Sequence, residues 1–209
     1  MRAKFNKIIS AMVLSAAIFS GSAIAQTESS NIQSVVGTAT ITDITPQIKT
    51  LLQVMGKNIS GFGTGPQKVN QMPLMVFFDP QCPHCKNLWS AASAPENKDI
   101  PIIWIPVGII NNLSMPQAAA IMQAPDAEKA MDIHQADIAT GGNGLKVNES
   151  EIQKDALDKV QRNTLLFGKM NLKSVPIILH ITKEGKLLIK EGDVDIKGIK
   201  ALYCLLYTS

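Results

Sequence analysis

The chain has 209 residues, of which 45% are hydrophobic and 18% are charged, so it can bury a core without disulfide staples. The formal net charge of +3 comes from the first 25 residues, because the remainder has 17 basic and 17 acidic side chains. This balance excludes a role that depends on strong positive charge, such as binding nucleic acid or an anionic surface.

Residues 1–25 have the pattern of a cleaved secretory signal peptide. Three basic residues precede an apolar run over residues 8–19, and Ala23-Ile24-Ala25 has the small-residue form that signal peptidase recognises. An apolar run of about 12 residues is too short to span a bilayer, which needs about 20. We therefore expect cleavage near Ala25, export to the periplasm and no stable membrane insertion.

Residues 26–69 predict a short N-terminal extension or linker that contains one helix. A strand is expected around residues 35–41. Thr45 is a suitable N-cap and Pro46 suits the first helical position. The helix should present one apolar face, formed by Ile48, Leu51, Leu52 and Met55. The glycine-rich segment 61–66 predicts a linker or turn.

Residues 70–203 predict an α/β domain with a mixed sheet. Apolar runs indicate buried strands at residues 74–78, 102–105 and 175–181, and an antiparallel strand at 187–189. A helix is expected from Cys82 to about Ala92. The block 114–167 is helical in pattern, with Asn148 and Glu151 as a capping box, and Asp195 should cap a last helix.

The chemistry is expected at Cys82-Pro83-His84-Cys85, where a buried strand meets a helix. Unpaired N–H groups and the helix dipole at this position favour a thiolate. Cys-x-x-Cys motifs reach pKa values of about 3.5 to 7.5, against about 8.5 for a free thiol. We predict that Cys82 is the nucleophile and that Cys85, one turn further on, resolves the mixed disulfide. The two cysteines would form a redox-active disulfide, and no other cofactor is expected.

The other residues of the motif suit this prediction. Pro83 fits the first helical turn, where its missing N–H costs nothing. His84 is a hypothetical stabiliser of the thiolate through its positive form, the alternative being a solvated polar residue. A zinc site would need more ligands at suitable spacing, and haem attachment would need histidine where Lys86 stands. A structural staple across two residues would close too small a loop to stabilise the fold.

Several segments resemble the DsbC/DsbG branch of periplasmic disulfide proteins. Residues 76–86 resemble its active-site block, and residues 107–110 with the helix at 118–121 resemble the segment after its second strand. Residues 174–177 resemble the loop that carries a cis-proline in thioredoxin-fold proteins. The resemblance covers roughly residues 70–203. It implies a thioredoxin-like α/β fold, with a central mixed sheet, flanking helices and a helical insertion at about 108–172.

The same resemblance implies roles and partners. Pro176 would be the cis-proline and Val175 the residue whose backbone contacts substrate. The protein would be a periplasmic thiol–disulfide oxidoreductase acting on exported polypeptides that contain cysteines. A membrane partner of the DsbD or DsbB type would restore its redox state.

Two departures from the branch leave the direction of exchange open. Proteins of this branch carry an N-terminal dimerisation domain and a joining helix, for which the roughly 48 positions of residues 26–73 are too few. Dimerisation, and isomerase activity with it, therefore stays open. Cys-Pro-His-Cys with valine before the proline is also the pairing of the oxidase DsbA. The leading hypothesis is a DsbG/DsbC-like isomerase or reductase; the alternatives are a DsbA-like dithiol oxidase and, from another class, a periplasmic chaperone or assembly factor.

Other residues with reactive or unusual side chains have simpler interpretations. Asp79 either tunes the thiols or merely ends a strand. His134 and His180 have no evident partner and are interpreted as surface or packing residues, Trp89 and Trp104 as core, and the glycines at 141–144 as a turn. Residues 204–209, beginning with Cys204, resemble sequencing read-through and form a possibly non-native tail; a native thiol that pairs between chains is the alternative.

Overall fold

The computed structural model describes residues 39–67, 72–182 and 184–204. The predicted signal peptide, the first residues of the strand predicted around 35–41, and residues 205–209 lie outside the described residues. Within the described part, none of the helices combines the length and the apolar character needed to cross a bilayer.

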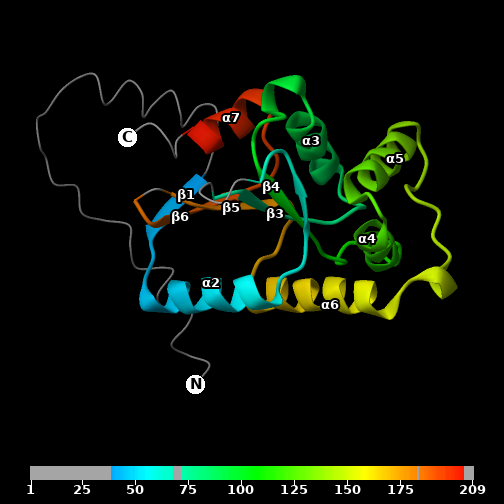
Figure 1. Cartoon of the computed structure of the whole chain (residues 1–209), viewed down its shortest axis with the longest axis horizontal. Helices are drawn as coiled ribbons and strands as arrows, with labels where there is room; N and C mark the ends of the chain where they lie inside the picture. Colours follow the sequence, from blue (N-terminus) through cyan, green and yellow to red (C-terminus); the bar gives the residue numbers. More distant parts are fainter. Residues whose placement is uncertain (1–38, 68–71, 183, 205–209) are drawn as a thin grey trace, which may run out of the picture. The chain divides into compact units, whose positions relative to one another are not determined.

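The described strands form a single mixed sheet in the order β1-β6-β5-β3-β4-β2 (Figure 1). The strands are β1 (Ala39–Asp43), β2 (Phe62–Thr64), β3 (Leu74–Phe78), β4 (Ile102–Pro106), β5 (Ile177–Ile181) and β6 (Lys186–Glu191). Strands β3 and β4 run parallel and every other pair is antiparallel. The central β3 is thus paired on both edges, and its side chains are packed into a core on each face of the sheet, which explains its unbroken apolar sequence.

Helices cover both faces of this sheet. They are α2 (Pro46–Asn58), α3 (Pro83–Ala92), α4 (Ser114–Gln123), α5 (Ala127–Ala139), α6 (Lys154–Lys169) and α7 (Ile196–Cys204). Figure 1 shows α2 and α6 along one face and α3 and α7 on the other, with α4 between α5 and α6. Helices α4, α5 and α6 occupy the connection between β4 and β5, where the helical insertion is predicted.

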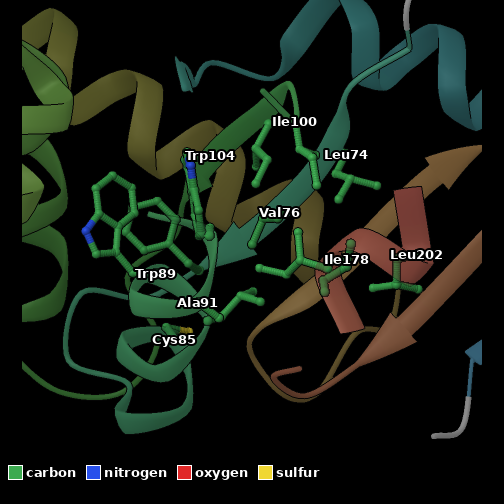
Figure 2. Close-up of a cluster of buried hydrophobic side chains, with 14 of the residues drawn as sticks. Leu74, Val76, Cys85, Trp89, Ala91, Ile100, Trp104, Ile178 and Leu202 are labelled. Atoms are coloured by element: carbon green, nitrogen blue, oxygen red, sulfur yellow. The ribbon is translucent and has the colours of Figure 1, made fainter. Parts of the chain in front are cut away.

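Alternation along β3 divides the core between the two faces. Val76 and Phe78 point toward α3 and α7, whereas Phe77 points toward α2 and α6, where its ring centroid lies 5.5 Å from that of Phe167. On the first face the rings of Trp89 and Trp104 are 4.8 Å apart between centroids (Figure 2). Both tryptophans are buried, so their prediction as core residues is confirmed.

The sheet extends further toward the N-terminus than the boundary predicted at residue 70. Strand β1 pairs with β6 and β2 pairs with β4, so the segment predicted as an extension supplies both edge strands. The turn predicted at 61–66 contains β2. Strand β2 is only three residues long and Gly63 has no side chain, so the segment is too short to show the alternating pattern of a strand.

Two of three predicted helix caps are confirmed. The Ile48 N–H donates to Thr45 Oγ1 at 3.3 Å at the start of α2, and the Gly198 N–H donates to Asp195 Oδ1 at 2.7 Å in α7. The third was wrong. Asn148 caps only a 3-10 turn at Glu149–Glu151, and α6 begins after Gln153, whose backbone is extended.

Candidate functional site

Cys82 lies where β3 has ended and α3 begins. It is the N-cap residue, with extended backbone angles, and its Sγ accepts the N–H of Cys85 at 3.4 Å. Pro83 follows at the first helical position, as predicted, and has no N–H to leave unpaired. The start of the helix therefore directs unpaired backbone donors toward this sulfur.

These donors make Cys82 an acidic thiol. The hydrogen bond with the Cys85 side chain lowers its pKa most, burial opposes this, and the backbone N–H groups of Cys85 and His84 together with the charge of the His84 ring lower it further, to about 6. One pH unit above its pKa, a group is about nine-tenths ionised. Cys82 is thus predominantly a thiolate at pH 7.

Cys85 has the opposite character. Its side chain is fully buried, and Figure 2 shows it among the residues of the core. Burial raises the pKa of Cys85 well above its ordinary value, and the hydrogen bond and charge of Cys82 raise it further. The two cysteines therefore differ sharply in ionisation although they lie one helical turn apart.

The fold brings the loop before β5 against Cys82. The Val175–Pro176 peptide bond is cis, the geometry that the family resemblance implies. Cys82 Sγ lies 3.3 Å from the carbonyl oxygen of Val175, to which it donates a hydrogen bond when it is protonated. The Gly192 N–H donates to the Pro176 carbonyl at 2.9 Å and ties this loop to the end of β6. A half-buried backbone edge thus lies beside the nucleophile.

His84 points toward a residue that the sequence did not single out. Its ring Nδ1 lies 3.2 Å from Asp193 Oδ1, and the other carboxylate oxygen accepts from the Asn87 amide at 2.9 Å. Burial raises the pKa of Asp193, but the hydrogen bond from Asn87 and the charge of His84 outweigh it, so this pKa lies below its ordinary value. His84 and Asp193 are 109 residues apart, and no local pattern relates them.

Asp79 lies beneath the motif and is fully buried. Its carboxylate accepts three backbone N–H groups, those of Gln81 at 2.9 Å, Ile109 at 2.7 Å and Ile110 at 3.1 Å. Asp79 therefore joins the turn before Cys82 to the loop after β4. A backbone hydrogen bond of Asp79 lowers the pKa of Cys85 and the charge of its carboxylate raises it, and burial has a larger effect than either.

His134 and His180, interpreted from the sequence as surface or packing residues with no evident partner, are packing residues that do have partners. Both are buried, and each bonds a backbone carbonyl: Nε2 of His134 lies 2.9 Å from the Pro80 oxygen, and Nδ1 of His180 lies 3.1 Å from the Pro73 oxygen. Burial lowers the pKa of both rings. Every residue has a backbone carbonyl, so no residue type in the sequence could indicate that these distant carbonyls would be the partners.

In the part of the chain that the structure describes, no group of three or more His, Cys, Asp or Glu side chains is placed to hold a metal ion. The residues predicted for catalysis and substrate binding come together at one end of β3. They are Cys82, Pro83, His84, Cys85, Val175 and Pro176. The arrangement pairs an anionic sulfur with a neutral thiol and an adjacent backbone edge.

The chain is similar to two thiol:disulfide interchange proteins named DsbG. It is 27% identical over 129 residues to DsbG of Escherichia coli, covering 61% of this chain and 50% of that protein. It is 28% identical over 119 residues to DsbG of Pseudomonas aeruginosa, covering 56% and 45%. The chain thus spans about half the length of these curated relatives. No protein-family model matches it.

A solved structure shares its fold. The catalytic domain of Proteus mirabilis ScsC superposes with a TM-score of 0.57 at 18% identity, over 76% of this chain and 97% of that domain. The thioredoxin-like fold predicted from the sequence, with its mixed sheet and flanking helices, is confirmed. The resemblance to the DsbC/DsbG branch is confirmed as well.

Proposed function

We propose that this protein is a thiol–disulfide oxidoreductase that exchanges disulfides with exported polypeptides through Cys82 and Cys85. The observation that carries the proposal is the position of Cys82 at the N-cap of α3, where its Sγ accepts the Cys85 N–H at 3.4 Å and its pKa is lowered to about 6. Thiolates, not thiols, attack disulfides, so this sulfur is reactive at neutral pH. The sequence similarity to two DsbG proteins supports the same chemistry.

Each step of the reaction exchanges one sulfur–sulfur bond for another. In the reducing direction the Cys82 thiolate attacks a substrate disulfide, and the second substrate sulfur leaves as a thiolate. Cys85 then gives its proton to that thiolate and attacks Cys82 Sγ. The substrate leaves with both sulfurs reduced, and the protein keeps a Cys82–Cys85 disulfide as its redox group. If a substrate thiolate attacks the mixed disulfide first, the substrate disulfide is rearranged and Cys82 leaves unchanged.

The proposed substrate site is the backbone edge at Val175 and Pro176. The Val175 carbonyl lies 3.3 Å from Cys82 Sγ, so an extended peptide along this edge would place its own sulfur beside the nucleophile. Backbone pairing recognises a peptide without reading its side chains. This suits a protein that acts on many unfolded polypeptides.

We propose isomerase or reductase activity of the DsbG/DsbC type as the direction of exchange. A pKa of about 6 for Cys82 lies between those of thioredoxin, about 7, and DsbA, about 3.5, so the disulfide should be a moderate oxidant. A DsbD-type membrane protein would then return electrons. The Cys-Pro-His-Cys motif with Val175 before the proline favours the alternative, a DsbA-like oxidase served by a DsbB-type partner. The equilibrium with glutathione distinguishes them, because a weakly oxidising couple excludes the oxidase.

The proposed compartment is the periplasm. The signal-peptide pattern of residues 1–25 and the similarity to DsbG support it. The proposed partners are exported proteins with cysteines, met before or during their folding.

Trapping mixed disulfides tests the proposal. A Cys85→Ala variant lacks the resolving thiol, so exported proteins should accumulate in complexes bonded to Cys82 and come free on reduction. The matched control is the double variant Cys82→Ser/Cys85→Ala, which should trap none. Equal complexes in both variants, or none in either, would contradict the proposal. A chaperone that needs no thiol would keep its anti-aggregation activity unchanged in Cys82→Ser.

A further inference from the structure

A tight turn over residues 79–82 leads to Cys82, and hydrogen bonds hold both the carbonyl and the N–H of its central peptide unit. The Cys82 N–H donates to the Asp79 carbonyl at 3.0 Å, with Pro80 and Gln81 between them. The Gln81 N–H donates to Asp79 Oδ1 at 2.9 Å, and the Pro80 carbonyl lies 2.9 Å from Nε2 of His134. A rotation of the Pro80–Gln81 peptide unit would redirect the chain at Cys82, and these two bonds oppose it.

The hydrogen bonds of His134 define its tautomer. The Leu145 N–H donates to Nδ1 at 3.0 Å, so Nδ1 carries the lone pair and the proton is on Nε2, where it is donated to Pro80. The ring is fully buried and uses both nitrogens. The neutral ring therefore connects α5 to the turn before Cys82. Burial lowers its pKa most, and the charges of Asp137 and Asp79 act in the opposite direction.

The glycines at 141–144 have a role in this arrangement. A Cβ at Gly144, whose φ is +84°, would overlap the His134 ring, and one at Gly142 would overlap the carboxylate of Asp137. The Gly144 N–H also donates to Asp137 Oδ2 at 2.9 Å. Only residues without a side chain let this loop close over the imidazole and deliver the Leu145 N–H to it.

The same loop holds the residue next to the nucleophile. The Gln81 side-chain amide donates to Gln117 Oε1 on α4 at 2.6 Å and to the Asn143 carbonyl at 2.9 Å, and its oxygen accepts from Asn111 at 3.1 Å. Pro80 and Gln81 are thus both anchored to the connection between β4 and β5. The helical insertion, and not only the sheet, determines where the chain enters α3.

We propose that His134 is a positioning residue for Cys82, acting through the Pro80 carbonyl and held in place by the glycine loop 141–144. It touches neither the sulfur nor the substrate. Its hydrogen bond fixes the turn, and the turn fixes the N–H groups that stabilise the thiolate. The importance of His134 for function rests on the proposed thiol–disulfide exchange, whereas its effect on the position of Cys82 does not.

The test compares two buried histidines of the same kind. His134→Leu removes the bond to Pro80, and His180→Leu removes the matching bond to Pro73, which precedes β3 at its other end. Thiolate absorbance of the reduced protein gives the pKa of Cys82, and the glutathione equilibrium gives its oxidising strength. We expect His134→Leu to raise this pKa by about half a unit to one unit and to change the equilibrium constant roughly threefold to tenfold, since one unit corresponds to tenfold. His180→Leu should leave both unchanged, although it destabilises the fold.

Two further variants keep the test decisive. Gly144→Ala, at the buried glycine whose added Cβ would displace the His134 ring without removing the imidazole, should reproduce the rise in pKa. His134→Gln supplies an amide donor for Pro80 and should restore most of the original pKa. An unchanged pKa in folded His134→Leu or Gly144→Ala, or an equal rise in His180→Leu, would overturn the proposal. If the wild-type protein exchanged no disulfides but its Cys82 pKa still responded to His134, the positioning role would stand and the proposed function would fall.

Discussion

The difference between Cys82 and Cys85 arises from their positions in one helix. The first sulfur lies at the N-cap, where the Cys85 N–H reaches it, and the second lies inside the core that α3 forms with the sheet. Hydrogen bonding lowers one pKa and burial raises the other. An acidic thiol and a neutral thiol therefore follow from a three-residue spacing, since only the sulfur at the N-cap is reached by N–H groups of the first helical turn.

His84 should make a measurable contribution to the ionisation of Cys82. Its ring charge lowers the pKa of Cys82, although less than the hydrogen bonds from Cys85 do. We expect His84→Ala to raise this pKa by less than about one unit, because the backbone donors remain. Lys86→Ala is the control, since it removes a positive charge one turn beyond the N-cap. A larger rise from Lys86→Ala, in the same thiolate titration, would show that general charge and not His84 controls the sulfur.

At the scale of the elements, one buried side chain joins three of them. Asn163 on α6 donates to the Ser60 carbonyl at 2.7 Å and to the Pro106 carbonyl at 2.9 Å, and it accepts the Ser60 N–H at 3.0 Å. It is fully buried. This amide connects the end of β4 and the segment between α2 and β2 to the same helix, and so holds α6 against the sheet.

Loss of Asn163 should therefore be costly. Asn163→Leu would leave three backbone groups without partners in a buried region, at roughly 1–3 kcal/mol for each unsatisfied group, so we expect a loss of about 3 kcal/mol in the free energy of unfolding after partial relaxation. Urea unfolding measures it as a lower midpoint with an unchanged slope. Leu165→Gln, at a position 59% exposed on the same helix, should change the midpoint little. Similar losses in both variants would indicate that α6 is merely sensitive to substitution.

At the scale of the whole molecule, two buried histidines make the fold sensitive to acid. His134 and His180 lie at opposite ends of β3, and burial lowers the pKa of each below 6.5. Below that value the unfolded chain binds protons that the folded protein does not. The free energy of unfolding therefore falls as the pH drops through the interval between the ordinary and the lowered pKa.

The prediction is a stability that decreases from pH 7 to pH 5, by up to about 1.36 kcal/mol per pH unit for each histidine. It is measured by urea unfolding of Cys82→Ser, which removes the titration of that thiol. His180→Gln in this background should be less stable at pH 7 but should lose clearly less stability on acidification. Equal decreases with and without His180 would assign the acid sensitivity to other groups.

Whether a feature could be predicted from the sequence depends on how far apart its interacting residues lie along the chain. The start of α3 at Cys82, the caps Thr45 and Asp195, and the buried strands β3 and β4 were predictable, because the chemistry of each lies within a few residues. Strand β2 was not predictable, because three residues that include Gly63 are too few to show the alternating pattern of a strand.

By itself, the sequence determined an α/β domain with a mixed sheet and singled out Cys82 and Cys85, because the apolar runs, helix caps and cysteine spacing that indicate them are local. The thioredoxin-like class was implied by the resemblance of residues 70–203 to the DsbC/DsbG branch. Only the tertiary structure decided that Asp193 lies beside His84 and that His134 bonds the turn before the nucleophile. These contacts join residues between about 50 and 110 positions apart, and they depend on how helices pack rather than on any periodic pattern, so they exist only once the chain has folded.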